Sequence, residues 1–515
     1  MFRKLAFFGF LLRRAYATGP GLTLETMNQN MRNVSSFILR DINEAPIGME
    51  YAVRGKVVIT ADSITSSLKS SPTSYPFSKI IYTNIGNPHS VGQKPLTWPR
   101  QVLALVDLPD EAGVDNPNVS KLFPSDAVER AKVLKEYMGG CGSGAYSHSQ
   151  GIRGIREEVA EFIEERDGGI KCNPDDLFLT NGASTGIGHI LTACISSPTS
   201  GVMIPIPQYP IYSASLALLG GKQVGYYLDE GKEWSASMEE LERSLEEAKG
   251  RGVDVKAFVL INPGNPTGQV LSKDAIADVV KFCSKHSLIL LADEVYQENV
   301  YDPKKTFISC KKAASDAGML GQLELVSFHS TSKGIFGECG RRGGYMELTG
   351  FDPDVQAQIY KLASSGLCSG IPGQVMTSLM VKGPSPGSVS YESYEKEKAT
   401  IFDSLKRRAI MVVEGLNKIE GFSCQPAEGS MYCFPKVEMP KKAIEAARKE
   451  GTNVDTLYAL SLLEATGICV VPAAGFGQEP GRAGFRTTFL PQEEEMKQAV
   501  ELFKVHHEQF LEKYK

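Results

Sequence analysis

Paired cysteines are missing from this chain of 515 residues. Its ten cysteines are scattered without a Cys-x-x-Cys motif, and its seven histidines show no metal-ligand spacing. These absences argue against a zinc ribbon and against a disulfide framework, and they favour a reducing compartment. We therefore expect no metal site, and we place the neighbouring His506 and His507 on the surface of a C-terminal helix.

A long basic tract is also missing. The formal net charge is −5, and neither an internal repeat nor a low-complexity linker interrupts the sequence. This charge disfavours a nucleic-acid partner, because proteins that bind nucleic acids normally concentrate positive charge. Hydrophobic residues make up 42% of the chain and charged residues 22%, which is typical of globular enzymes. The expected partners are small molecules, with no nucleic acid and no membrane.

No acidic residue precedes Glu25. On a helix, the aromatic and leucine side chains of Met1–Gly19 would face away from several basic residues, which is the pattern of a mitochondrial presequence. The competing interpretation is a secretory signal, with an apolar core over Leu5–Leu12. The basic pair Arg13-Arg14 and the free cysteines argue against that signal. We predict a targeting presequence over residues 1–20 and a mitochondrial-matrix location, with the cytosol as the alternative.

Apolar strands alternate with helices between about residues 126 and 370, which predicts an α/β fold with a mostly parallel sheet. Polar or aromatic motifs follow the ends of four of these strands. In open α/β sheets, ligands bind at the carboxyl ends of the strands. We therefore expect the four motifs to meet at one edge. The strands are predicted over Val202–Ile206, Val255–Ile261, Leu288–Ala292 and Glu324–Phe328.

The last of these strands leads into Ser330-Thr331-Ser332-Lys333-Gly334, and Arg342 follows nine residues after the lysine. A lysine among hydroxyls and glycines, with an arginine in reach, is what a protein needs to hold a phosphorylated aldehyde as a Schiff base. This motif predicts pyridoxal 5′-phosphate as the cofactor, with Lys333, Ser330 and Ser332 at the site. Alone, the motif would be weak evidence, because hydroxyl-rich segments beside a lysine are common on surfaces.

The other three motifs match the needs of the same cofactor. Asp293 can keep a pyridine nitrogen protonated, which makes the ring an electron sink. Asn265 and Tyr296 can hydrogen-bond a phenolic oxygen, and Tyr209 offers a flat face for the ring. Singly, each residue has an ordinary structural role, such as capping a helix or shaping a turn. Their common position in chain order favours the cofactor site.

A phosphate also needs backbone donors. Asp176–Thr180 reads as a strand and Ile187–Ile195 as an apolar helix, so Gly182, Ala183 and Ser184 would begin that helix. A helix N-terminus attracts a dianion through its free N–H groups and its dipole. We predict Ala183 and Ser184 as phosphate ligands.

The order Asn265-Pro266-Thr267-Gly268, Asp293-x-x-Tyr296, Ser330-x-Ser332-Lys333 and Arg342 resembles the class I/II aminotransferases of the aspartate aminotransferase fold. The strings NPGNPTG, LADEVYQEN, FHSTSKG and GECGRRGGYMELTG resemble the alanine aminotransferase branch of that family. The resemblance extends from about Glu50 to the C-terminus. It implies a ping-pong transfer in which L-alanine and 2-oxoglutarate give pyruvate and L-glutamate.

The resemblance also implies roles for single residues. Lys333 would carry the cofactor and move the substrate proton, and Arg486 would bind the substrate α-carboxylate beside Gly86. Tyr146 would reach the phosphate in the other subunit of a homodimer. Alignment on Gly344-Tyr345 selects Arg342 as the phosphate arginine, with Arg341 as the alternative.

The expected architecture is that of fold type I, with a seven-stranded, mostly parallel sheet in a large domain and a smaller α+β domain. The predicted domains are residues 21–125 for the N-terminal arm and part of the small domain, 126–390 for the large cofactor domain and 391–515 for the C-terminal small domain. The smaller domain would combine the C-terminal region with residues near the N-terminus.

Three other functions would account for parts of the sequence. A glutamate–glyoxylate or other broad-specificity aminotransferase would share every motif named above, because specificity depends on pocket shape. A short-chain dehydrogenase is suggested by the glycines of Asn181–Gly188 and by the spacing of Tyr301 and Lys305, but Pro303 disfavours the required helix. A ligand-sensing transcription regulator would need a DNA-binding module, for which the residues before position 50 are too few.

Overall fold

The computed structural model describes residues 42–49, 55–140 and 142–515. The chain divides into two units, Met1–Gly48 and Met49–Lys515. In the first unit, the side chain of Asn43 accepts a hydrogen bond from the backbone N–H of Ala45 and caps helix α3 (Glu44–Ile47). The predicted presequence, residues 1–20, lies outside the described residues.

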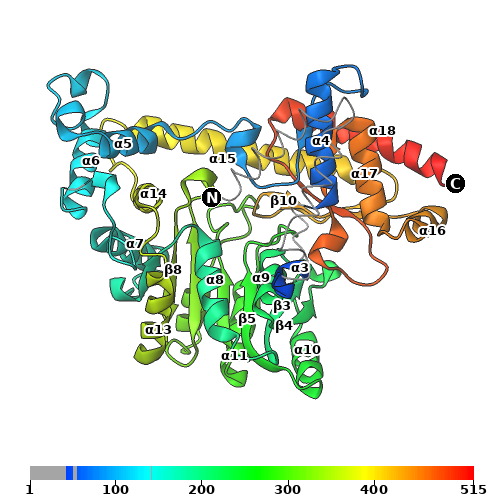
Figure 1. The fold of residues 1–515 in the computed structure, drawn as a ribbon, viewed down its shortest axis with the longest axis horizontal. Helices are drawn as coiled ribbons and strands as arrows, with labels where there is room; N and C mark the ends of the chain where they lie inside the picture. The colour runs from blue at the N-terminus through cyan, green and yellow to red at the C-terminus, as the bar shows by residue number, and fades with distance from the viewer. Residues whose placement is uncertain (1–41, 50–54, 141) are drawn as a thin grey trace, which may run out of the picture. The chain divides into compact units, whose positions relative to one another are not determined.

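A seven-stranded sheet forms the centre of the second unit (Figure 1). Its strand order is β2-β8-β7-β6-β5-β3-β4, and every neighbouring pair is parallel except those that β8 makes with β2 and β7. The predicted α/β class with a mostly parallel sheet is therefore confirmed. The strands are β2 (Leu177–Leu179), β3 (Ser200–Ile206), β4 (Lys222–Tyr227), β5 (Asp254–Ile261), β6 (Ile289–Asp293), β7 (Leu325–Ser330) and β8 (Gly344–Thr349).

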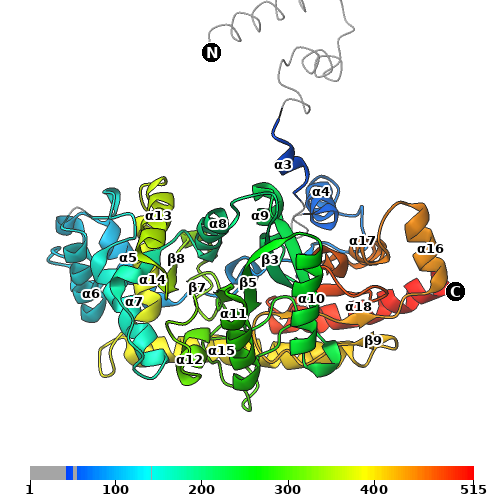
Figure 2. The same cartoon turned by 90° about the horizontal axis from the view of Figure 1, so that it is seen from below.

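Apolar residues cover both faces of this sheet. Along β5, Ala257 and Val259 belong to one hydrophobic cluster, while Phe258 and Leu260 belong to another, because successive side chains of a strand point to opposite faces. Figure 2 shows helices on each face. One face carries α8 (Ala183–Cys194), α9 (Ile211–Leu219) and α13 (Pro353–Ser364), and the other carries α10 (Met238–Gly250), α11 (Lys273–His286) and α12 (Cys310–Asp316).

A third hydrophobic cluster lies beside β8 and β2. Trp98, Ile155 and Val375 are among its buried members. The helices that build it lie together at the left of Figure 1. They are α5 (Thr97–Asp107), α6 (Ser125–Tyr137), α7 (Arg153–Arg166) and α14 (Ile371–Val381).

The long helix α15 (Tyr391–Leu416) runs from this helical cluster to the C-terminal part of the unit (Figure 1). There α4 (Lys56–Ser70) packs on α17 (Val454–Thr466), and β1 (Ile81–Tyr82) pairs in parallel with β12 (Ile468–Cys469). The other strands and α-helices of this C-terminal part are β9 (Phe422–Ser423), β10 (Tyr432–Cys433), β11 (Lys436–Val437), α16 (Lys441–Lys449), β13 (Val471–Pro472), β14 (Phe485–Thr488) and α18 (Glu493–Lys513).

The domain boundaries at 125 and 390 remain predictions.

The prediction that His506 and His507 are exposed is wrong. Both side chains are buried, with exposed fractions of 2% and 1%, because α18 turns this face toward Tyr458 of α17. Burial lowers the pKa of His506 to about 4, so this histidine is neutral in the folded protein.

Within residues 42–49, 55–140 and 142–515, no helix combines the length and the apolar character needed to cross a membrane.

Candidate active site

The carboxyl ends of β5, β6 and β7 open on one cavity of about 920 Å³. Asp293 is the last residue of β6, and Lys333 follows the end of β7 by three residues. Twelve of the thirteen residues predicted for the site line this cavity. They are Gly86, Ala183, Ser184, Tyr209, Asn265, Asp293, Tyr296, Ser330, Ser332, Lys333, Arg342 and Arg486.

Lys333 places its amine inside the cavity. The Nζ atom donates a hydrogen bond to the backbone oxygen of Gly86 over 3.3 Å and lies 5.9 Å from the centre of the Tyr296 ring. Gly334 allows the chain to turn here, because its φ of 64° lies in the left-handed region. An added Cβ at this glycine would approach the Glu298 carboxylate to 2.7 Å. The turn therefore favours glycine on both counts.

Asp293 is a buried carboxylate with one unsatisfied oxygen. Its Oδ2 atom accepts a hydrogen bond from the Tyr212 hydroxyl over 2.9 Å, whereas no hydrogen bond reaches its buried Oδ1 atom. Burial raises the pKa of Asp293 to about 6. A protonated ring nitrogen facing Oδ1 would supply the missing donor and the missing positive charge. This carboxylate therefore fits a pyridinium group.

The N-terminus of α8 and the side chain of Arg342 form an anion site. The guanidinium of Arg342 donates to the Asn181 backbone oxygen over 2.8 Å and to the Ser184 hydroxyl over 3.3 Å. Helix α8 starts at Ala183, so its first N–H groups lack partners within the helix. The buried hydroxyl of Ser332 lines the same cavity without a hydrogen-bond partner. These donors suit a phosphate dianion.

Gly182 lets Arg342 approach the helix. An added Cβ at Gly182 would lie 2.6 Å from the Nη2 atom of Arg342, so a larger residue would displace the guanidinium from its present position. The predicted alternative, Arg341, also lines the cavity, but its guanidinium lies 3.9 Å from the carboxylate of Glu338. The geometry therefore favours Arg342 as the partner of a phosphate.

Arg486 is buried in the cavity wall with 1% of its surface exposed. Its Nη1 atom donates to the Asn265 side-chain oxygen over 3.0 Å, and its Nη2 atom donates to the Asn84 backbone oxygen. The Nε–H has no partner, and an unsatisfied buried donor costs roughly 1–3 kcal/mol. A bound carboxylate would recover part of this cost, which suits Arg486 to recognise an α-carboxylate.

Two tyrosines at the site escaped the sequence analysis. Tyr432 lines the cavity beside Arg486, and Tyr212 holds the carboxylate of Asp293. Tyr432 stands on β10, which reaches Arg486 through the pairing of β10 with β14. That pairing joins strands more than 50 residues apart in the sequence, so no local sequence pattern predicts it. Tyr212 belongs to an apolar helix, where its ring resembles any core aromatic.

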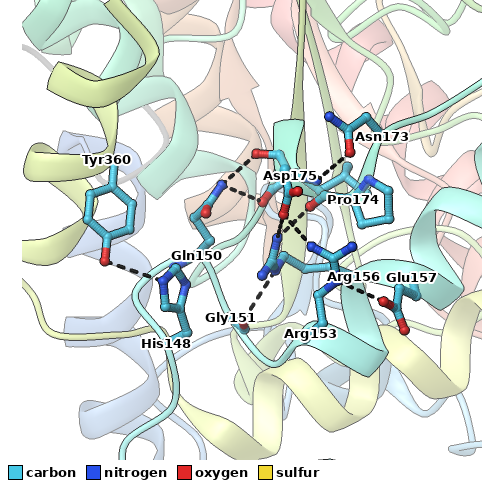
Figure 3. Close-up of polar contacts among 11 residues, drawn as sticks. His148, Gln150, Gly151, Arg153, Arg156, Glu157, Asn173, Pro174, Asp175 and Tyr360 are labelled. Atoms are coloured by element: carbon cyan, nitrogen blue, oxygen red, sulfur yellow. Dashed lines mark hydrogen bonds and ion pairs between the residues drawn. The ribbon is translucent and has the colours of Figure 1, made fainter. Parts of the chain in front are cut away.

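Tyr146 is the one predicted residue that does not line the cavity. Its side chain is 78% exposed. The backbone that follows it is held in place by the contacts drawn in Figure 3. Gln150 donates to the Asp175 backbone oxygen over 2.8 Å, and the Tyr360 hydroxyl lies 3.4 Å from the Nε2 atom of His148. Tyr146 therefore projects from an anchored segment.

The polar cluster in Figure 3 centres on the carboxylate of Asp175. Arg153 and Arg156 both reach this carboxylate, and Arg156 also donates to the Pro174 backbone oxygen over 2.6 Å. Because Arg153 and Arg156 belong to α7, the cluster ties the start of that helix to the turn before β2.

Comparison with known proteins identifies the family. Residues 124–503 match the family described as aminotransferase class I and II. The chain belongs to this family. It is 51% identical to alanine aminotransferase 1, mitochondrial, of Arabidopsis thaliana, over 93% of this chain and 88% of that protein. It is 44% identical to glutamate–glyoxylate aminotransferase 2 of the same organism, over 96% of this chain and 97% of that protein.

The fold agrees with solved structures of aminotransferases. The alanine aminotransferase of Pyrococcus furiosus superimposes with a TM-score of 0.70 at 24% identity, over 91% of this chain and all of that chain. At this identity the likeness establishes the fold alone. Class I and II aminotransferases depend on pyridoxal 5′-phosphate and act on amino acids and 2-oxo acids, and this chain is one of them.

The described residues fit this cofactor at both of its ends. The unsatisfied oxygen of Asp293 suits the ring nitrogen, and the donors of α8 and Arg342 suit the phosphate. Lys333 opens into the same cavity and suits the aldehyde. The individual roles of these residues remain predictions.

Proposed function

We propose that the protein transfers the amino group of L-alanine to 2-oxoglutarate, giving pyruvate and L-glutamate. The reaction type rests on one arrangement: Lys333, Asp293 and Arg486 open on a single cavity. The choice of substrates rests on the 51% identical alanine aminotransferase of Arabidopsis thaliana.

The residues divide the work of holding the cofactor and substrate. Arg342, Ser184 and the first N–H groups of α8 would hold the phosphate, and Asp293 would keep the ring nitrogen protonated. Arg486 would bind the α-carboxylate and so orient the α-carbon toward Lys333. When bound, pyridoxal phosphate supplies a carbonyl carbon that takes the amino group and a ring that accepts the electron pair left at the α-carbon.

Lys333 would move the proton. Its Nζ atom, once it is a free amine, would take the α-proton of the amino acid and deliver it to the former carbonyl carbon of the cofactor; in the second half of the reaction it would move a proton from that carbon to the α-carbon of the 2-oxo acid. Asp293 and Arg486 themselves are buried in the wall of the cavity, with exposed fractions of 4% and 1%, so both charged groups would act away from bulk water. Nothing in this sequence of steps requires a metal ligand.

Direct observation of the first half of the reaction would test the proposal. The purified protein with its cofactor is mixed with L-alanine in the absence of any 2-oxo acid, and the visible absorption and the pyruvate formed are recorded. We expect loss of the visible band and one pyruvate per site. If the band persists with L-alanine and disappears only with another amino acid, the substrate assignment fails while the reaction type stands.

A second candidate is glutamate–glyoxylate transfer, because a 44% identical relative carries that name over nearly its whole length. The two candidates differ in their acceptors. After discharge with L-glutamate, the protein is offered pyruvate or glyoxylate, and kcat/KM is compared. A larger value for glyoxylate would favour this second function.

We also propose that the protein works as a homodimer in which Tyr146 of each chain completes the other chain's site. The exposure of this side chain, on an anchored segment, supports the proposal. We also propose that the large cofactor domain spans residues 126–390, between the N-terminal part and the C-terminal small domain.

We further propose a mitochondrial-matrix location, supported by the name of the Arabidopsis relative. Fusion of residues 1–20 to a fluorescent protein tests the location directly.

A further inference from the structure

Tyr432 lines the cavity beside Arg486. Its strand, β10, pairs antiparallel with β14, and this pairing brings the tyrosine ring against Arg486. The carbon at the centre of the guanidinium lies 4.2 Å from the centre of the Tyr432 ring and 4.7 Å from that of Phe476. Two aromatic rings therefore contact the guanidinium and restrict its orientation.

The hydroxyl of Tyr432 ends a chain of hydrogen bonds. The Asn265 amide donates to the Tyr296 hydroxyl over 3.4 Å, and the Tyr296 hydroxyl donates to the Tyr432 hydroxyl over 3.2 Å. No described residue accepts the proton of Tyr432 in turn. By contrast, Tyr226 and Tyr301 are also buried, and each donates its proton to a backbone oxygen over 2.7 Å.

This hydroxyl lies where the reacting groups meet. A Cβ added to Gly86 would lie 2.3 Å from the Tyr432 hydroxyl and 3.0 Å from the Nζ atom of Lys333. The glycine therefore leaves open the space that borders both atoms. A small group placed there would touch both the tyrosine hydroxyl and the lysine amine, and the tyrosine ring in turn contacts the guanidinium of Arg486.

The charges around Tyr432 favour an anion. Burial raises the pKa of Tyr432, but the positive charges of Lys333 and Arg486, together with the hydrogen bond from Tyr296, outweigh burial, and the net pKa is lowered. A phenol in this environment is a strong hydrogen-bond donor to a carboxylate.

We propose that Tyr432 contacts the substrate: its ring orients the guanidinium of Arg486, and its hydroxyl donates a hydrogen bond to the α-carboxylate. The inference rests on the proposed function, in which Arg486 binds that carboxylate. It adds a second donor to carboxylate recognition.

Propionate is the probe that tests this contact, because it carries the carboxylate and the methyl end of L-alanine without the amino group. The holoenzyme is assayed with L-alanine while propionate is added as a competitor. In Tyr432→Phe, the ring remains and the hydroxyl is lost. We expect propionate to bind about 10- to 100-fold more weakly, the range for a hydrogen bond to a charged group, with the same loss in kcat/KM for L-alanine and L-glutamate.

The matched control is Tyr226→Phe, which removes an equally buried hydroxyl from β4. This variant should bind propionate as the wild type does. The Tyr432→Leu variant, which also removes the ring, should lose at least a further threefold or so in propionate affinity, because the guanidinium loses one aromatic contact. Thermal unfolding and cofactor content are measured for each variant to show that it is folded.

The outcomes separate the two proposals. If the wild type binds propionate in competition with L-alanine and Tyr432→Phe binds it equally well, the hydroxyl does not contact the carboxylate and this inference is overturned. If the wild type transfers no amino group and does not bind propionate, the proposed function and the inference fall together. A selective loss in Tyr432→Phe supports both.

Discussion

At the scale of single residues, Lys333 provides the sharpest test of the site. Lys333→Ala removes the amine that we propose moves the α-proton, while Arg342 and α8 keep their contacts. We expect the rate of amino transfer to fall by at least roughly 10³-fold, since positioned proton transfer contributes about 10² to 10⁴. The measurement is a single-turnover assay with L-alanine, combined with the amount of pyridoxal phosphate retained.

The matched control for this substitution is Lys304→Ala, because Lys304 is an exposed lysine outside the cavity. The control should transfer at the wild-type rate. Normal turnover by Lys333→Ala would exclude the lysine from the reaction. Loss of the cofactor from that variant would show that attachment to Lys333, rather than the phosphate donors alone, is needed to retain it.

The raised pKa of Asp293 predicts that the stability of the cofactor-free protein depends on pH. Burial raises the pKa of this carboxyl from its ordinary 3.8 to about 6, so between these values the folded state binds more protons than the unfolded state. The free energy of unfolding therefore falls as the pH rises through this window, by roughly 3 kcal/mol for two pKa units. Asp293→Asn should lack this decrease.

The comparison uses urea unfolding of both proteins without cofactor at pH 4 and pH 7.5. We expect the wild type to lose on the order of 1–3 kcal/mol relative to Asp293→Asn between the two values. Equal changes in both proteins would show that the carboxylate is not held at a raised pKa. The asparagine can still accept the hydrogen bond from Tyr212, which keeps this pair comparable.

The sequence identified those site residues whose chemical role follows from their residue type and their position after a strand. Lys333, Asp293 and Asn265 follow recognisable strands, and a lysine or a carboxylate at a strand end carries its own chemical signal. Tyr432 and Tyr212 carry none, because a tyrosine in an apolar segment looks like core. Their roles depend on which side chains from distant parts of the sequence they contact, and a single sequence does not show which residues are close in space.

At the scale of elements, the start of α8 tests the phosphate site. Gly182 has φ 75° and ψ 167°, a region essentially confined to glycine, and it lies against the Arg342 guanidinium. Gly182→Ala should lower the free energy of unfolding by roughly 1–3 kcal/mol. It should also weaken cofactor affinity by at least about 10-fold, because it displaces Arg342.

The same helix supplies the control. Gly188 lies inside α8 with nothing within 4 Å of an added Cβ, so Gly188→Ala should stabilise the protein by about 0.5–1 kcal/mol and leave cofactor affinity unchanged. Thermal unfolding and titration with pyridoxal phosphate give both quantities. Equal cofactor affinity in the two variants would remove Arg342 and α8 from the phosphate site.

Among the elements, the buried strands were the most predictable. The apolar runs Val255–Ile261 and Leu288–Ala292 lie within one residue of β5 (Asp254–Ile261) and β6 (Ile289–Asp293). Both strands are covered on two faces, so an unbroken apolar run marks them. The two-residue strands of the C-terminal part, such as β10 and β12, give no such run, because their partners rather than their composition define them.

At the scale of the whole molecule, the cavity is lined by residues that lie far apart in the sequence, Gly86 and Arg486 among them. Arg486 reaches the sheet edge only because β14 pairs with β10 and β13, which belong to the C-terminal part of the fold. The residues proposed for carboxylate recognition and those proposed for cofactor binding therefore come from separate regions of one compact unit. Family resemblance, rather than periodicity, predicted this convergence.

A mixture of two inactive or impaired chains tests whether the site is also shared between subunits. Lys333→Ala lacks the amine, whereas Tyr146→Phe lacks only the exposed hydroxyl proposed to reach the other chain's phosphate. In a hybrid dimer, the Tyr146→Phe chain keeps its own Lys333 and receives an intact Tyr146 from its partner. That dimer therefore contains one fully native site, and the other site lacks both groups.

We expect cofactor affinity at the Lys333-containing site of the hybrid to return to the wild-type value, after purification of the hybrid through two different affinity tags. The Tyr146→Phe homodimer should bind pyridoxal phosphate about tenfold more weakly, as expected for a lost hydrogen bond to a charged group. Titration of both dimers gives the comparison. A hybrid as weak as the Tyr146→Phe homodimer would mean that Tyr146 serves its own chain or none, because only an exchange between subunits can restore a group that the Lys333-bearing chain does not possess.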